Sequence, residues 1–175
     1  MRRLVLLRHA KTEPAGFGER DRERKLTKRG RADAALIGGY MASHGLVPDL
    51  ALVSPATRTQ ETWALASAAL AKPPRMRTAD RIYNADAEAL IGVIGEVGKQ
   101  AHTLLVVGHN PGLQDLALRL IGFGEVGTRD RLKQKLPTSG LAVIDLPLDD
   151  WSLLSAQTGR LERFVSPGLL AKGTD

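Results

Sequence analysis

Four residues whose side chains suit phosphoryl chemistry stand just after short apolar segments of the chain: Arg8, His9, Arg58 and His109. Arginine presents a planar fork of donors that matches phosphate oxygens, and its charge is permanent. Histidine beside such a group can act as a covalent nucleophile, or it can stabilise the group being transferred. If these side chains meet, they would form a pocket that binds and transfers a phosphoryl group.

The apolar segments before these residues have the length and composition of buried strands: Leu4–Leu7, Leu50–Ser54 and Thr103–Val107. In a parallel sheet the carboxyl ends of the strands lie side by side, and ligands of open α/β sheets bind just outside them. Any one of the four residues alone would be an ordinary surface or turn residue. Because all of them follow such segments, we expect the two histidines and two arginines to converge.

Longer segments with helical patterning alternate with the strands, which is typical of βαβ units. Thr27 is placed to N-cap a helix that runs to about His44 and is ended by Gly45. Three further helices are expected over residues 55–71, 86–98 and 110–120. In the last of these, Asn110 is the expected N-cap and Pro111 the first helical residue.

The remaining segments complete the sheet. Arg75–Ala85 is expected to form a short edge strand and a loop, and Gly140–Leu146 to form a fourth strand. Residues 150–156 and 159–165 suggest a closing antiparallel hairpin at one edge. The expected fold is α/β, a three-layer α/β/α sandwich with a mostly parallel central sheet and an antiparallel edge, in a single domain over residues 1–175.

The composition narrows the class of protein. No segment approaches the roughly 18 to 20 apolar residues of a membrane span, and the N-terminus leads directly into a short strand instead of a secretory signal. The chain has no cysteine, which excludes disulfides and thiolate metal sites. We therefore expect a soluble, cytoplasmic protein that binds no membrane and uses no metal or other cofactor.

The net charge of +6 is concentrated in one segment, Glu19–Arg31, which holds seven basic and three acidic residues. A charged loop leading into a helix is the plainer interpretation of this segment, and steering of an anionic substrate is the alternative. A nucleic-acid partner is not expected. Aromatic residues make up only 4% of the chain, so stacking platforms for bases are poorly supplied.

The expected start of the helix at Asn110 adds a further anion-binding feature, because free N–H groups and the positive end of the helix dipole point toward the same place. Asn110 is therefore a candidate substrate-binding residue beside the two arginines. His9 is the candidate nucleophile, and cationic neighbours should favour its neutral form. His109 is expected to stabilise the transferred group. The chain lacks a GxxxxGK[ST] loop and is not expected to be a nucleoside triphosphatase.

The segments "LRHAKTE", "LTKRG", "SPATRTQET" and "VVGHNPG", in this order, resemble the histidine phosphatase superfamily with its phosphoglycerate-mutase-like fold. The similarity extends from Leu4 to about Leu146 and is greatest to the small bacterial branch of SixA phosphohistidine phosphatases. The resemblance implies that His9 accepts the phosphoryl group and that no metal takes part. It implies that the phosphate pocket is completed by Arg8, Arg58 and His109.

The sequence departs from the family pattern in two places. The usual Arg-His-Gly reads Arg8-His9-Ala10, a change between small residues that should leave the nucleophile unaffected. Other branches carry a glutamate acid after the second helix, and "DRIYNADAEAL" does not reproduce it. The proton donor is therefore open among Asp86, Glu88 and Glu13. Asp86 is better explained as a helix N-cap, and a glutamate in the first turn as a complement to the helix dipole.

These observations predict a phosphatase that works through a phosphohistidine intermediate on His9 and acts on protein phosphohistidine. An imidazole leaves a phosphoramidate without a strong acid, and so short a chain has no large insertion to enclose a small sugar phosphate. One alternative is a broad phosphomonoesterase that uses Asp86 or Glu88 as acid. Another is a phosphate-binding module without catalysis. The sequence leaves the oligomeric state open.

Overall fold

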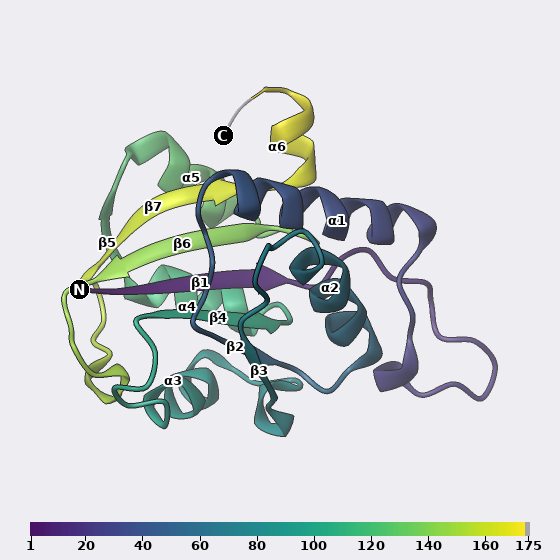
Figure 1. Ribbon diagram of the computed structural model, residues 1–175, viewed down its shortest axis with the longest axis horizontal. Coiled ribbons are helices and arrows are strands. Elements are labelled where there is room, and N and C mark those ends of the chain that lie inside the picture. The colour runs from purple at the N-terminus through teal and green to yellow at the C-terminus, as the bar shows by residue number, and fades with distance from the viewer. Residues whose placement is uncertain (174–175) are drawn as a thin grey trace.

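The computed structural model of the chain describes residues 1–173, and within them seven strands form one sheet (Figure 1). The strand order is β3-β2-β4-β1-β6-β7-β5. The strands are β1 (Arg2–Arg8), β2 (Leu50–Val53), β3 (Arg75–Thr78), β4 (Thr103–Gly108), β5 (Ile121–Gly124), β6 (Leu141–Leu146) and β7 (Gly159–Val165). Only β6, among these strands, runs against its neighbours β1 and β7.

Helices cover both faces of this sheet (Figure 1). They are α1 (Lys28–Ser43), α2 (Thr57–Ser67), α3 (Ala87–Gly95), α4 (Gly112–Leu120), α5 (Val126–Gln134) and α6 (Pro167–Ala171). The short 3₁₀ helices are η1 (Asp21–Glu23), η2 (Asp80–Ile82) and η3 (Trp151–Leu153). The arrangement confirms the predicted α/β class and the mostly parallel sheet, with the antiparallel pairing on the side that ends in β5.

Two apolar clusters join the layers, because successive side chains of a strand point to opposite faces. Leu4 and Leu6 of β1 belong to the cluster that includes α3 and α4, whereas Val5 and Leu7 belong to the cluster that includes α1 and α2. All four side chains are fully buried. Burial on both faces explains why β1 is an unbroken apolar segment.

The helix α1 has the ends that the sequence predicts. The Thr27 hydroxyl accepts a hydrogen bond from the Gly30 N–H at 2.9 Å, and Gly45 follows the helix with φ of +65°. Gly38 allows α1 to approach α2 closely, since a Cβ atom at this position would lie 2.3 Å from the carbonyl oxygen of Ala66. This close approach fixes the position of α2.

Several predicted element boundaries differ from the structure. Helix α2 begins at Thr57, after Pro55, and ends at Ser67, several residues before the predicted end. Helix α4 begins at Gly112 with Pro111 as its N-cap, so the prediction that Asn110 is the N-cap was wrong. The proline instead lies in the turn that connects β4 to the helix, where it donates no backbone hydrogen bond.

The predicted C-terminal hairpin is also wrong. Residues 150–156 contain η3, and the Trp151 side chain is fully buried, with its indole N–H donating to the Ala101 carbonyl at 2.8 Å. Strand β7 pairs with β6 on one side and with β5 on the other. The apolar residues near Trp151 therefore serve the packing of a short helix and not a strand ladder.

None of the helices within residues 1–173 has both the length and the hydropathy of a membrane span.

Candidate active site

The register of β1 and β4 brings the two histidines together. Arg8 pairs with Gly108 across these parallel strands, so the residues that follow, His9 and His109, leave the sheet side by side. Their ring centroids lie 5.5 Å apart. Both side chains are buried, with 9% of His9 and 8% of His109 exposed. The expected convergence at the carboxyl ends of the strands is thus present for this pair.

The ring of His9 is held by its own backbone neighbour. Its Nδ1 lies 2.8 Å from the carbonyl oxygen of Ala10, which can only accept, so Nδ1 carries the proton. The Ala10 N–H in turn donates to the Thr62 hydroxyl on α2 at 2.9 Å. In the neutral ring, Nε2 therefore holds the free electron pair, and this tautomer selects Nε2 as the nucleophilic atom.

Burial and positive charge keep His9 neutral. Burial lowers its pKa to about 4, and the guanidinium groups of Arg58, Arg8 and Arg24 act in the same direction, while the hydrogen bond to Ala10 opposes them. A neutral imidazole can attack an electrophilic phosphorus, whereas an imidazolium cannot. His9 is accordingly ready to act as a nucleophile at neutral pH.

The ring of His109 is held through one of its nitrogens by Ser54. Its Nε2 lies 2.7 Å from the Ser54 hydroxyl at the end of β2, and its Nδ1 is buried with no hydrogen-bond partner among residues 1–173. If the Ser54 hydroxyl donates to Nε2, the ring proton lies on Nδ1, free for an anionic oxygen. Burial lowers the pKa of His109 to about 3, and the positive charge of Arg58 adds to this effect.

The two arginines reach the site from different elements. Arg8 donates from Nη1 to the Leu136 carbonyl at 3.0 Å, while its Nε is buried without a partner in the described chain. Burial lowers the pKa of Arg8. Arg58 lies in the first turn of α2 and is only 5% exposed, so it is not the exposed helix residue that its position alone would suggest. An arginine so deeply buried needs an anionic partner.

Asn110 stands next to this group but is engaged by the protein. Its side-chain N–H donates to the Leu136 carbonyl at 2.9 Å, the same oxygen that accepts from Arg8. Its side-chain oxygen accepts from the Gln114 N–H at 3.3 Å. The structure therefore places Asn110 as a link between the β4–α4 turn and the segment before β6, and its substrate-binding role stays a prediction.

Asp21 and Tyr83 lie at the site although the sequence analysis did not select them. Asp21 accepts from Arg58 Nη1 at its carbonyl oxygen, 2.8 Å away, and from Nη2 at Oδ2, 3.1 Å away. Its Oδ2 also accepts from the Tyr83 hydroxyl. The Tyr83 ring meets that of His109 edge-on at 5.5 Å between centroids. The only hint in the sequence is that Asp21 is an acidic residue within a basic segment.

The comparison with known families settles the class of this site. A family model described as the histidine phosphatase superfamily (branch 1) matches residues 4–104. The chain belongs to this superfamily. Three of the four predicted pocket residues lie inside the matched segment, and His109 follows just beyond its end. The resemblance inferred from the sequence motifs is confirmed.

Relatives of this histidine phosphatase cover nearly its whole length. An uncharacterized protein of Mycobacterium leprae is 33% identical over 165 residues, which are 92% of this chain and 99% of the relative. A structure from Agrobacterium tumefaciens, provisionally named phosphohistidine phosphatase SixA, has 33% identity and a TM-score of 0.81, covering 95% of this chain and 98% of its own. A similarly named structure from Nakamurella multipartitia has 26% identity and a TM-score of 0.82, covering 95% and 96%.

Two of the three candidate proton donors are engaged elsewhere through their carboxylates. Asp86 N-caps α3 by accepting from the Ala89 N–H at 2.8 Å, and Glu88 forms an ion pair with Arg119 at 2.6 Å. Glu13 is exposed, and its backbone N–H donates to the Lys25 carbonyl. Within residues 1–173, none of these carboxylates forms a hydrogen bond or ion pair with the two histidines or two arginines of the site.

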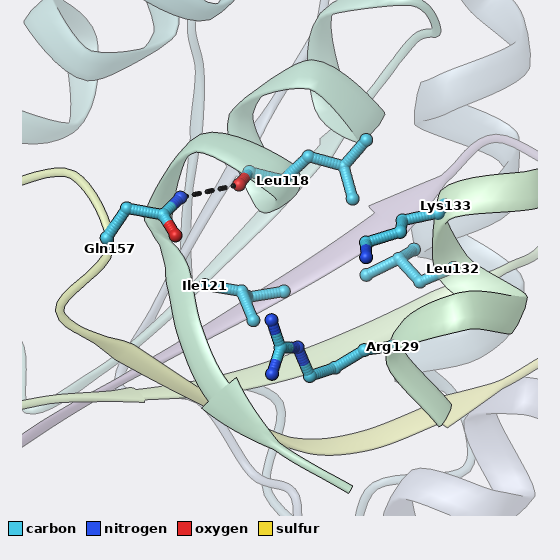
Figure 2. A pocket seen from close by; sticks show the side chains of 6 residues that line it. All are labelled: Leu118, Ile121, Arg129, Leu132, Lys133 and Gln157. Atoms are coloured by element: carbon cyan, nitrogen blue, oxygen red, sulfur yellow. Dashed lines mark hydrogen bonds between the residues drawn. The ribbon is translucent and has the colours of Figure 1, made fainter. Parts of the chain in front are cut away.

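A separate cavity of about 250 Å³ lies between α4, β5 and α5 (Figure 2). Figure 2 shows Arg129 and Lys133 extending from α5 toward Ile121, with Gln157 hydrogen-bonded to the Leu118 carbonyl. The residues that line the cavity include none of the predicted site residues. It is therefore distinct from the pocket at the ends of β1, β2 and β4.

Proposed function

We propose that this histidine phosphatase removes phosphate from protein phosphohistidine by way of a covalent phosphohistidine on His9. The observation that carries the proposal is the state of His9. Its ring is buried, is neutral because its pKa is lowered to about 4, and is oriented by Ala10 so that Nε2 holds the electron pair. Two arginines and a second imidazole lie close to this ring.

In the first step, the Nε2 electron pair of His9 forms a bond to phosphorus, and the bond from phosphorus to the substrate nitrogen breaks. The electron pair of that bond stays on the departing imidazole, which leaves as a neutral ring when its other nitrogen carries a proton. His9 keeps its proton on Nδ1 and becomes positively charged. The carbonyl of Ala10, 2.8 Å from Nδ1, stabilises that charge.

In the second step, a water molecule attacks the phosphorus, and the bond to Nε2 breaks with its electron pair returning to the ring. One water proton passes to the solvent or to a phosphate oxygen, and inorganic phosphate is the product. Arg8, Arg58 and His109 lie near His9, and their positive charges and N–H groups would stabilise the equatorial oxygens in both steps.

The acids available near the site favour a phosphohistidine substrate. Within residues 1–173, the carboxylates Asp86, Glu88 and Glu13 form no hydrogen bond or ion pair with the histidines and arginines of the site, and Asp21 is a poor acid. The hydrogen bond from Tyr83, followed by those from Arg24 and Arg58, lowers the pKa of Asp21 to about 2. An alkoxide leaving group would need a proton in the transition state, whereas a protonated phosphoimidazole supplies its own. The names of the SixA-like structures support the same substrate class.

The test compares wild type with His9→Ala on a phosphohistidine peptide and on p-nitrophenyl phosphate. We expect His9→Ala to abolish turnover of both and to remove the alkali-stable, acid-labile phosphate that wild type retains. His102→Ala, which replaces an exposed histidine outside the site, is the matched control. Normal turnover by His9→Ala would refute the covalent mechanism. A strong preference for the ester would instead support a broad phosphomonoesterase.

A further inference from the structure

The carboxylate of Asp21 lies at the centre of a ring of donors. Its Oδ2 accepts from Arg58 at 3.1 Å and from the Tyr83 hydroxyl, and its Oδ1 accepts from Arg24 Nη1 at 3.2 Å. Two guanidinium groups and a phenol are the kind of donor set that binds a tetrahedral oxyanion. In this protein an internal carboxylate occupies that set.

Arg58 is the donor for which Asp21 and a phosphoryl group would compete. Only 6% of the Arg58 side chain is exposed, compared with 49% of the Asp21 side chain. The guanidinium is therefore too deeply buried to be solvated by bulk water. Its Nη2 donates to the Asp21 carboxylate, and its Nη1 donates to the backbone carbonyl of the same residue. The Asp21 carboxylate is the more exposed partner of this pair.

We propose that Asp21 is a specificity-determining residue that weakens the binding of dianionic phosphate groups, including the inorganic phosphate product, by holding Arg58 and repelling added negative charge. This inference rests on the proposed function in one respect, namely that Arg58 contacts the phosphoryl group. A phosphoryl dianion entering the pocket must share the guanidinium with a carboxylate a few ångströms away.

The same repulsion discriminates between substrates. A phosphohistidine protonated on its second ring nitrogen carries a positive charge that offsets part of the phosphoryl charge, whereas a simple ester dianion has no such offset. The carboxylate of Asp21 attracts the positively charged imidazole of the phosphohistidine and repels the ester dianion. Asp21 therefore favours phosphoramidates over esters and favours release of phosphate.

Glu23 offers a matched control on the same short helix. It carries the same charge as Asp21 in η1, and its side chain accepts from the Arg20 N–H at 3.3 Å. It has no hydrogen bond or ion pair with Arg58 in the described chain. Replacing Glu23 removes one negative charge from the same short helix without releasing Arg58, so it separates the specific contact from a general change in charge.

The experiment measures binding of inorganic phosphate by calorimetry, at fixed ionic strength, to wild type, Asp21→Asn, Asp21→Ala and Glu23→Gln. We expect both Asp21 variants to bind phosphate about tenfold more tightly than wild type, and Glu23→Gln to stay within about twofold. Asp21→Asn keeps the size of the side chain and an acceptor oxygen for Arg58. Asp21→Ala removes that acceptor and so shows whether a hydrogen bond from Arg58 to the asparagine affects phosphate binding. Thermal unfolding establishes that each variant is folded.

A second measurement uses turnover. The ratio of kcat/KM for p-nitrophenyl phosphate to that for the phosphohistidine peptide should rise about tenfold in Asp21→Asn and stay unchanged in Glu23→Gln. Phosphate binding that is equal to wild type or weaker in both Asp21 variants would overturn this inference and leave the proposed function standing. If none of the four proteins binds phosphate, the pocket is not a phosphoryl site, and both proposals fail.

Discussion

The rings of His9 and His109 lie 5.5 Å apart between centroids, although 100 positions separate them in the chain. The pairing of β1 with β4 produces this proximity, because each histidine is the first residue beyond its strand. The two rings are held in different ways. The free electron pair of His9 is on Nε2, whereas the unpartnered atom of His109 is Nδ1. Under the proposed function, His9 would attack the phosphorus and His109 would stabilise the transferred group.

The first prediction concerns the acid limb of the pH–rate profile. Because the pKa of His9 is lowered to about 4, the nucleophile stays neutral well below the ordinary pKa of a histidine. We expect the ring signals of His9, followed by NMR and assigned with His9→Gln, to titrate near pH 4. The acid limb of kcat/KM reports ionisations of the free enzyme and of the free substrate. The pKa that belongs to the enzyme should agree with the pH at which His9 titrates. Titration at about 6.5 would contradict this expectation.

The second prediction concerns stability. Burial lowers the pKa of both His9 and His109 in the folded chain. At pH values between the ordinary histidine pKa and these lowered values, the unfolded chain therefore binds more protons than the folded chain. The free energy of unfolding should therefore fall as the pH drops from about 6.5 toward 4. Urea unfolding at a series of pH values measures the slope. The slope should decrease in His109→Asn and remain in His102→Asn.

The third prediction concerns Ser54, whose hydroxyl lies 2.7 Å from Nε2 of His109. Ser54→Ala removes the partner that orients this ring, so we expect kcat to fall about tenfold, the order of one hydrogen bond, with less change in KM. Steady-state kinetics measures both constants. Ser155→Ala, at an exposed serine, is the control. Equal activity of the two variants would show that Ser54 does not position His109.

The fourth prediction concerns the packing of α1 on α2. A Cβ atom at Gly38 would lie 2.3 Å from the Ala66 carbonyl oxygen, whereas a Cβ atom at Gly39 would meet nothing within 4 Å. We expect Gly38→Ala to destabilise the protein by about 1 to 3 kcal/mol. Gly39→Ala should be neutral or stabilising by up to about 1 kcal/mol, because alanine is the better helix former. Denaturant unfolding of the two neighbours checks the contrast.

The sequence predicts the part of the site that depends on local patterns. Arg8, His9 and His109 follow unbroken apolar segments, and parallel pairing then brings them together without further information. Asp21 was not predicted, because its contact with Arg58 depends on how a segment without regular periodicity folds back over α2. The single-domain organisation and the catalytic roles of the site residues stay predictions.

The C-terminal part shows why apolar patterning alone can mislead. Trp151 and its neighbours read as a strand, yet the size of the indole favours insertion into the core from a short helix. Strand β5 was not predicted, because its sequence has little of the patterning that is typical of a strand. It is short and contains glycines, and only its pairing with β7 stabilises it as a strand.

The reversed direction of β6 has a consequence for how this enzyme can vary. Because β6 runs against β1, the segment that enters β6 arrives at the end of the sheet where β1 finishes. There the Leu136 carbonyl accepts hydrogen bonds from the side chains of Arg8 and Asn110. The Ser139 N–H donates to the carbonyls of Arg8 and His9. Insertions or deletions between α5 and β6 would shift the Leu136 carbonyl and the Ser139 N–H. We therefore expect loop length in relatives to vary at the opposite rim of the sheet and not in this connection.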